Sequence, residues 1–158
     1  MLNKKWSSLD NEYKTGGLKR GHFAEYFAEM QLMLHGFEVY KTLVDDRGID
    51  FIIRKPKGVF FEIQVKSITD YDNIVIKMDK FDIANKHLYL LAVQFVDDKD
   101  PEMYIIPSTR WTKPDNIFYA GENIKNPQYG LRLTKSNLGS LQEYKLETYI
   151  EKIKTIKN

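Results

Sequence analysis

Apolar residues recur every three or four positions near the start of the chain, which predicts a helix from Leu18 to about His35. Gly36 follows directly, at the place where a helix often ends in a glycine. Residues 1–17 show no such pattern and end in Gly16-Gly17, so we expect them to form a flexible N-terminal arm. The remaining residues, 18–158, are expected to form a single domain.

Three strands are predicted after this helix, at Phe37–Leu43, Ile49–Arg54 and Val59–Ile68. The segment Asp45–Gly48 has the composition of a turn between the first two strands. Pro56, Lys57 and Gly58 form a tight turn between the second and third, which predicts that these two strands are a hairpin.

The rest of the chain alternates between strand and helix signals. A short helix is predicted over Lys80–Asn85, and His87–Val96 is almost entirely apolar, as is typical of a strand buried on both faces. Met103–Pro107 is predicted as another strand, residues 108–133 as irregular with short strands, and Leu138–Ile156 as the last helix. This order predicts an α/β fold in which helices flank one central mixed sheet.

Polar residues occupy one face of the third predicted strand. Side chains on a strand alternate between its two faces, so alternate residues of this strand form one apolar face and one polar face. The apolar set is Phe61, Ile63 and Val65, and the polar set is Glu62, Gln64 and Lys66. An ordinary amphipathic strand with its polar side in water would show the same alternation.

Asp50 changes this interpretation because it interrupts the apolar run of the second strand, where Asp is disfavoured. If the hairpin pairs around its tight turn, Asp50 lies near Gln64 and Lys66 across the ladder. Carboxylate and amide oxygens suit Mg²⁺, which takes one or two carboxylates together with substrate phosphates. Such an ion polarises a phosphoryl group, and a nearby lysine can orient water or stabilise developing charge.

Composition narrows the function further. The chain has 24 Lys and Arg against 22 Asp and Glu, a net charge of +2, so composition alone does not indicate nucleic-acid binding. The absence of Cys excludes disulfides, thiolate metal sites and cysteine nucleophiles. The start of the chain lacks the apolar segment of a secretory signal and no apolar run could span a bilayer, so we expect a cytoplasmic protein without a membrane partner.

The residues of this hairpin match a known superfamily. The run from Asp50 to the segment Glu62-Ile-Gln-Val-Lys66 resembles the active-site motif of the PD-(D/E)XK, or restriction-endonuclease-like, nucleases. Gly21-His-Phe-Ala-Glu25 resembles the first-helix Gly-x-x-x-Glu of Holliday-junction resolvases and group I intron homing endonucleases in that superfamily. The Gln-Val-Lys strand is similar to that of small bacterial nuclease-like domains. The resemblance covers about Leu18–Ile68 and continues more weakly to the C-terminus.

This resemblance implies a restriction-endonuclease-like core with the order α-β-β-β-α-β. It also implies an Mg²⁺-dependent endonuclease, with Mn²⁺ as a substitute, that hydrolyses phosphodiester bonds in a nucleic acid, expected to be DNA. The implied metal ligands are Asp50, Glu62, Gln64 and Glu25, and the implied catalytic residues are Lys66, Gln64 and Glu25. Many relatives act as dimers, so a homodimer is a further expectation.

Two departures from the superfamily motif leave alternatives open. Ile49 replaces the proline, and Gln64 replaces the acid of the (D/E)-x-K unit. Gln64 could occupy the acid's position with Glu62 as a helper, or Glu62 could supply the charge from one pleat away. We favour a direct contribution from Glu62, because Asp50 alone would hold Mg²⁺ weakly, and both alignments keep Lys66. The alternative function is a catalytically inactive nucleic-acid-binding or protein-interaction module of the same fold.

One further segment could contact nucleic acid. Trp111, with Arg110 and Lys113 beside it, could stack on a base and hold a phosphate. A tryptophan between turns is more often a lid on the hydrophobic core, and we favour that interpretation.

Overall fold

The structure is a computed structural model that describes residues 5–10, 16–44, 47–121 and 125–157. Parts of the predicted arm and of the Asp45–Gly48 turn therefore lie outside the described residues. The helices are α1 (Gly16–Leu34) and α2 (Leu146–Lys154), with 3-10 helices η1 (Trp6–Leu9), η2 (Met78–Lys80), η3 (Ser108–Thr112) and η4 (Gly139–Tyr144). The strands are β1 (Glu38–Lys41), β2 (Phe51–Arg54), β3 (Phe60–Thr69), β4 (Asp72–Lys77), β5 (Leu88–Phe95), β6 (Glu102–Pro107), β7 (Phe118–Gly121) and β8 (Gln128–Leu133).

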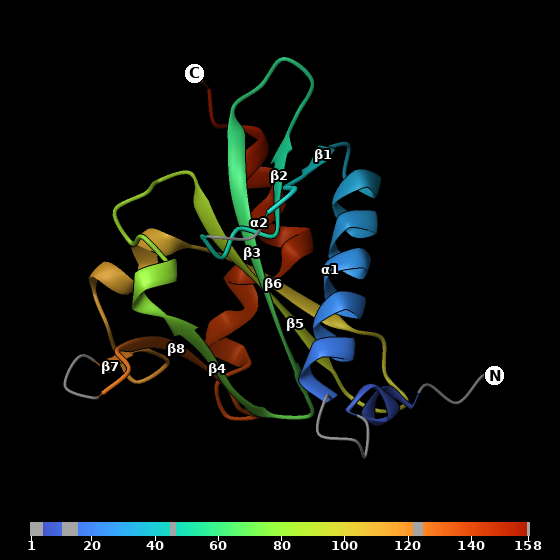
Figure 1. The fold of residues 1–158 in the computed structure, drawn as a ribbon, viewed down its shortest axis with the longest axis vertical. Helices are drawn as coiled ribbons and strands as arrows, with labels where there is room; N and C mark the ends of the chain where they lie inside the picture. Colours follow the sequence, from blue (N-terminus) through green and yellow to red (C-terminus); the bar gives the residue numbers. More distant parts are fainter. Residues whose placement is uncertain (1–4, 11–15, 45–46, 122–124, 158) are drawn as a thin grey trace.

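The described strands form two sheets. The larger sheet has the order β1-β2-β3-β5-β6 and is mixed, because β3 and β5 are parallel while its other neighbours are antiparallel. The smaller sheet, β4-β8-β7, is antiparallel. In Figure 1, α1 and the smaller sheet lie on opposite sides of β3. The α/β fold with a central mixed sheet that the sequence predicts is confirmed.

Helix α1 packs on the larger sheet through small and apolar residues spaced four apart. Ala24, Ala28 and Leu32 are fully buried, and their spacing places them on one helix face. The helix ends as predicted, since Gly36 has a φ of +86°. The Gly36 N–H donates to the Met33 carbonyl, and the next N–H donates to the Leu32 carbonyl.

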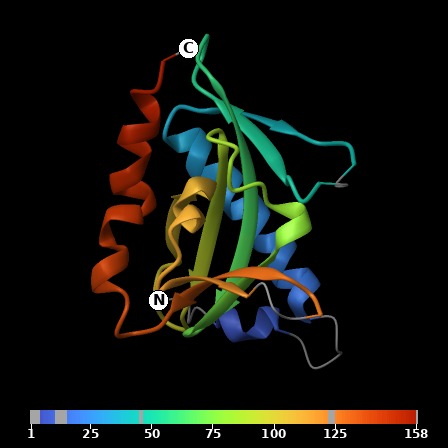
Figure 2. The same cartoon turned by 90° about the vertical axis from the view of Figure 1, so that its left-hand side faces the viewer.

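The larger sheet has a hydrophobic core on each face. Alternate residues of β5 enter different cores, and all eight of its residues are buried, which confirms the prediction for this strand. The residues Tyr89, Leu91, Val93 and Phe95 share a core with α1 and α2, whereas Leu88, Leu90 and Ala92 share one with the smaller sheet. Figure 2 shows α2 at one side of the molecule with the strands beside it.

A sharp corner connects the two sheets, because only two residues lie between the end of β3 and the start of β4. Asp70 at this corner has a φ of +62°. Its N–H donates a 2.7 Å hydrogen bond to the Phe95 carbonyl. Its carbonyl accepts a 2.8 Å bond from Nε2 of the buried Gln94 side chain. The end of β5 therefore fixes the backbone where the chain passes from one sheet to the other.

Two predicted helices differ from the structure. The predicted helix over Lys80–Asn85 is wrong, because only Lys80 is helical, as the last residue of η2, and irregular residues and turns follow it. The Asp82 carboxylate accepts from the Ala84 N–H and the Asn85 side chain accepts from the His87 N–H, and such local bonds compete with a helix. The predicted helix Leu138–Ile156 is divided into η4 and α2 at Lys145, whose backbone is extended and pairs with Tyr104.

The N-terminal residues that the structure describes pack against the domain. Trp6 of η1 lies against Phe95 and Phe23, with ring centroids 5.3 and 5.7 Å apart. The Asp97 carboxylate accepts hydrogen bonds from the backbone and the hydroxyl of Ser7. Within the described ranges, no helix has the length and apolar character needed to cross a membrane.

Candidate active site

The β2–β3 hairpin places Asp50 beside the middle of β3. Phe51 pairs with Ile63 at the end of the ladder, and Asp50 directly precedes Phe51. The Asp50 N–H donates a 2.9 Å bond to the Ile63 carbonyl. The Val65 N–H donates a 2.6 Å bond to Asp50 Oδ2. The hairpin predicted from the tight turn is confirmed, and it orients the Asp50 carboxylate across β3.

The two faces of β3 divide as the alternation predicts. Phe61, Ile63 and Val65 are buried in the core shared with the helices. Gln64, on the opposite face, is only 4% exposed. Its Oε1 is buried and has no hydrogen-bond partner among the described residues, which is unusual for a buried polar atom.

Gly48, in the loop before β2, allows this loop to approach β3 closely. It has a φ of +78°, a conformation that side chains other than glycine rarely adopt. A Cβ atom there would lie 2.8 Å from Nε2 of Gln64 and 3.1 Å from the Lys80 carbonyl oxygen. A glycine is therefore needed both for the backbone conformation and for the contact with Gln64.

Three of the five predicted site residues line one cavity of about 550 Å³. These are Asp50, Gln64 and Lys66, and Gly48 lines the same wall. The other lining residues come from the smaller sheet and the segments next to it, and they are Val75, Lys77, Lys80, Asn126 and Gln128. We call this space the Asp50 cavity. Its two walls thus belong to two different sheets.

Glu62 lies outside this cavity, although it is one pleat from Gln64 on the same strand. It lines a neighbouring cavity, also of about 550 Å³, together with Arg47, Asn85 and Tyr129. Asn85 Nδ2 donates a 2.7 Å bond to Glu62 Oε2, and the Asn85 carbonyl accepts from the buried Ser108 hydroxyl. Lys80 lines both cavities, so the two spaces adjoin each other.

Glu25 also lies outside the Asp50 cavity, on helix α1. Its Oε2 is 3.6 Å from Nδ1 of His22, and its side chain is partly exposed. In the part of the chain that the structure describes, there is no group of three or more His, Cys, Asp or Glu side chains that could hold a metal ion. The structure therefore does not gather the carboxylates of Asp50, Glu62 and Glu25 at one point.

The donors of the Asp50 cavity nevertheless fit Mg²⁺. Asp50 supplies a carboxylate and Gln64 an amide whose oxygen has no hydrogen-bond partner in the described structure. A half-turn of the amide exchanges its oxygen and nitrogen. Mg²⁺ commonly takes one or two protein oxygens and fills its remaining positions with water and substrate phosphate. Two oxygen donors beside an open cavity match that requirement.

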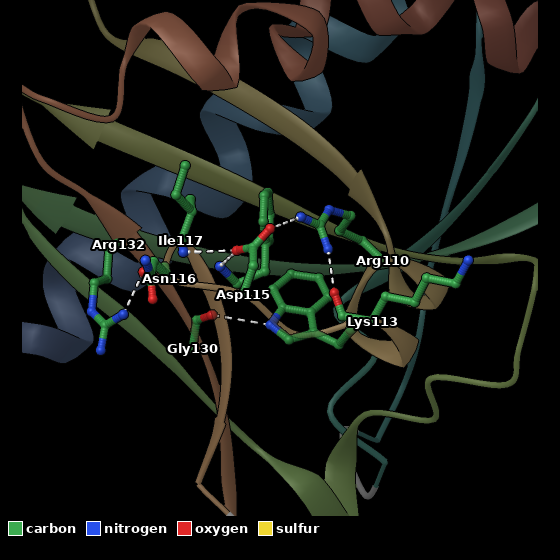
Figure 3. A network of polar contacts seen from close by, with 9 residues as sticks. Arg110, Lys113, Asp115, Asn116, Ile117, Gly130 and Arg132 are labelled. Carbon is green, nitrogen blue, oxygen red and sulfur yellow. Dashed lines mark hydrogen bonds and ion pairs between the residues drawn. The ribbon is translucent and has the colours of Figure 1, made fainter.

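Trp111 is a lid on the core, as favoured, and base stacking by this residue is excluded by its burial. It is 1% exposed and its Nε1–H donates a 3.0 Å bond to the Gly130 carbonyl. Figure 3 shows this bond and the adjoining network, in which Arg110 pairs with Asp115 and donates to the Lys113 carbonyl. The ion pair between Arg110 and Asp115 therefore connects η3 to the residues that precede β7.

The sequence did not predict the residues that line the Asp50 cavity from the side of the smaller sheet. Lys77 ends β4 and pairs with Gln128 at the start of β8, in a sheet that the sequence did not predict. The one available signal was the alternation of exposed and buried residues along Asp72–Lys77. That run is short, and the apolar Val75 interrupts its alternation of apolar and polar residues.

Comparison with known proteins identifies the fold. No family model and no curated protein matches the sequence. Solved structures do match, and they show that the chain has a restriction-endonuclease-like fold. The fold class predicted from the sequence is confirmed, and the resemblance to resolvases and homing endonucleases is confirmed as a likeness of fold.

Two of these structures can be named. One is Hjc, a Holliday junction resolvase from the archaeal hyperthermophile Archaeoglobus fulgidus, with a TM-score of 0.52 and 10% identity over 87% of this chain and 99% of that one. The other is the bacterial homing endonuclease I-Ssp6803I, with a TM-score of 0.51 and 20% identity over 87% of this chain and 90% of that one. At these identities the likeness is one of fold.

Proposed function

We propose that the protein is an Mg²⁺-dependent endonuclease that hydrolyses phosphodiester bonds in DNA. The observation that carries the proposal is that Asp50, Gln64 and Lys66 line one cavity, in a fold shared with nucleases. A carboxylate, an amide and an ammonium group at one opening provide the donors for a metal and a charge for a phosphate.

Asp50 and Gln64 would hold the metal in this proposal. The bound ion would polarise the phosphoryl group and favour a nucleophilic water. The Val65 N–H fixes one oxygen of Asp50, so the carboxylate is held in one orientation before any ligand binds. Of the two alignments of the motif, the cavity supports the one in which Gln64 occupies the acid's position.

Lys66 would act on the substrate. It lies one pleat from Gln64 on the same face of β3 and lines the same cavity. No ion pair within the described residues involves its ammonium group. The ammonium is therefore available to orient the attacking water and to stabilise negative charge that develops on the phosphate.

Glu62 and Glu25 are proposed to act from outside the Asp50 cavity. The Glu62 carboxylate holds Asn85 beside the neighbouring cavity, where it could position water or a neighbouring nucleotide. Glu25 lies beside His22 on α1. Neither carboxylate lines the Asp50 cavity.

The proposal also covers the alternative metal, the compartment and the oligomeric state expected from the sequence. We propose that Mn²⁺ can replace Mg²⁺, that the enzyme acts in the cytoplasm, and that two copies form a homodimer where both DNA strands are cut. These three proposals rest on the superfamily resemblance.

The decisive experiment is nicking of supercoiled plasmid by the purified protein. We expect nicking with Mg²⁺ or Mn²⁺ and none with EDTA or with the Lys66→Ala variant. Lys113→Ala is the matched control, because Lys113 is exposed and its side chain extends away from the network in Figure 3. Nicking that persists in Lys66→Ala would contradict the assignment of the site.

A second candidate function is a nucleic-acid-binding module without catalysis. The observation that favours it is Gln64, which carries no charge at the position of the motif's acid and would weaken metal binding. Absence of nicking on DNA and RNA substrates, with salt-dependent binding retained, would support this candidate over the enzyme.

A further inference from the structure

The charges around the Asp50 cavity are unequal. Its lining residues include one carboxylate, Asp50, and three lysines, Lys66, Lys77 and Lys80. A bound Mg²⁺ would add two further positive charges. Because like charges in a cavity destabilise one another unless a counter-charge binds, the cavity suits a ligand with more than one negative group.

Lys77 stands apart from the proposed catalytic residues. It is an exposed residue at the end of β4, whereas Asp50, Gln64 and Lys66 belong to the β2–β3 hairpin. Its partner in the ladder is Gln128 of β8, and Gln128 and Asn126 line the cavity beside it. A lysine with two neighbouring amides presents several N–H donors and no carboxylate of its own.

We propose that Lys77, together with Gln128 and Asn126, forms a second phosphate subsite. It would bind the backbone phosphate next to the one that Lys66 and the proposed metal ion would contact. Lysine and amide side chains commonly contact phosphate and sugar oxygens, and such contacts fix the register of a strand without reading its sequence. The inference rests on the proposed function in taking a nucleic acid as the ligand, but it does not require cleavage.

The subsite would determine which phosphate enters the catalytic position. A strand held at a single phosphate can rotate about it, whereas a strand held at two adjacent phosphates has a defined direction across the cavity. Lys77 is therefore a positioning residue for the substrate. Its contribution should appear in binding and in KM, while kcat at saturating substrate is retained.

The experiment measures binding without catalysis. A fluorescein-labelled DNA oligonucleotide is titrated with the wild-type protein in Ca²⁺ at several salt concentrations, and anisotropy gives the affinity. Lys77→Gln should weaken binding and reduce the slope of log affinity against log salt by about 0.7–0.9, the value for one lost phosphate contact. Lys77→Arg should keep the wild-type slope, and Lys113→Gln is the control for loss of a distant surface charge.

Each result is decisive for this subsite. An unchanged slope in Lys77→Gln, or no binding by the wild-type protein, would overturn the inference. So would equal Lys77-dependent binding of a polyglutamate peptide, because the subsite would then recognise acidic protein. Plasmid nicking separates this inference from the proposed function. Lys77-dependent binding without nicking would support the phosphate subsite and contradict the proposed nuclease function. Nicking with an unchanged slope in Lys77→Gln would support the nuclease function and contradict the subsite.

Discussion

The Val65 N–H donates a 2.6 Å hydrogen bond to Oδ2 of Asp50, and this bond ties the proposed metal ligand to the strand that carries Gln64 and Lys66. Val65 itself is buried on the opposite face of β3, against the helices. A charged acceptor thus stabilises the start of the hairpin, and Asp50 has a structural role as well as its proposed role in catalysis. Variants at this position can separate the two roles.

Asp50→Asn should retain the fold and lose the metal. The asparagine oxygen can accept the Val65 bond, so the free energy of unfolding without metal should stay within about 1 kcal/mol of the wild type. The gain in stability on adding Mg²⁺ should disappear. Asp50→Ala removes the acceptor and should cost about 1–3 kcal/mol. Urea unfolding with and without Mg²⁺ measures both effects, and an Asn variant that Mg²⁺ still stabilises would contradict the assignment.

Gln64→Glu should tighten Mg²⁺ binding and lower the Mg²⁺ concentration needed for cleavage. A carboxylate attracts the cation by several kcal/mol more than an amide does, even at an effective dielectric constant of about 20. Because Gln64 is 4% exposed, the variant should also be less stable than the wild type without metal, and Mg²⁺ should reverse that loss. Calorimetric Mg²⁺ titration and thermal unfolding test the two statements.

Glu62→Gln is the matched variant for that experiment. Glu62 lies in the neighbouring cavity with Asn85, so the amide should reduce Mg²⁺ affinity and cleavage only modestly. A loss as large as that of Asp50→Ala would show that Glu62 is the second carboxylate of the site and would reject the alignment based on Gln64.

Gly48→Ala should destabilise the protein and impair cleavage together. A left-handed backbone costs a residue with a Cβ roughly 1–2 kcal/mol, and the new methyl group would lie 2.8 Å from Gln64 Nε2. Gly139→Ala is the control, because nothing lies within 4 Å of a Cβ there. Urea unfolding and plasmid nicking are the measurements, and a Gly48→Ala variant with wild-type stability would show that the loop does not pack on Gln64 as described.

The contribution of Asp97 to the docking of η1 should be lost in acid. Hydrogen bonds from the hydroxyl and then the backbone of Ser7 lower the pKa of the Asp97 carboxyl below its ordinary value of 3.8. A lowered folded pKa means that the contribution to stability is present above pH 3.8 and is lost as the pH falls through the folded pKa. Asp97→Asn should therefore lower Tm near pH 7, and the difference from wild type should vanish at low pH. Asp98→Asn is the control for loss of a neighbouring carboxylate, since the hydrogen bonds from Ser7 go to Asp97.

Local periodicity accounts for the parts of the fold that could be predicted. Helix α1 and the alternation along β3 depend on residues close in sequence, and the turn after Arg54 fixes the register that brings Asp50 beside the middle of β3. The smaller sheet was missed because β4 pairs with β8, more than fifty residues away. A pairing over that distance leaves no signal within a short window.

The same limit applies to the site. Period-two alternation places Glu62, Gln64 and Lys66 on one face of β3, but it cannot say which cavity each one enters. Glu62 accepts a hydrogen bond from Asn85, which lies in the connection between η2 and β5. Lys77 enters the Asp50 cavity only because β4 folds back toward β3. Both placements depend on segments that the sequence pattern does not relate to β3.

The corner at Asp70 has a consequence for how substrate choice could change. One wall of the Asp50 cavity holds the residues proposed for catalysis. The other wall follows the corner at Asp70, whose backbone is held by hydrogen bonds to Gln94 and Phe95. Exchanging the outward-facing residues of β4 and β8 would therefore alter what the cavity admits without touching the hairpin that holds Asp50. Protein engineering could therefore vary β4 and β8 to change selectivity while the residues proposed for catalysis stay in place.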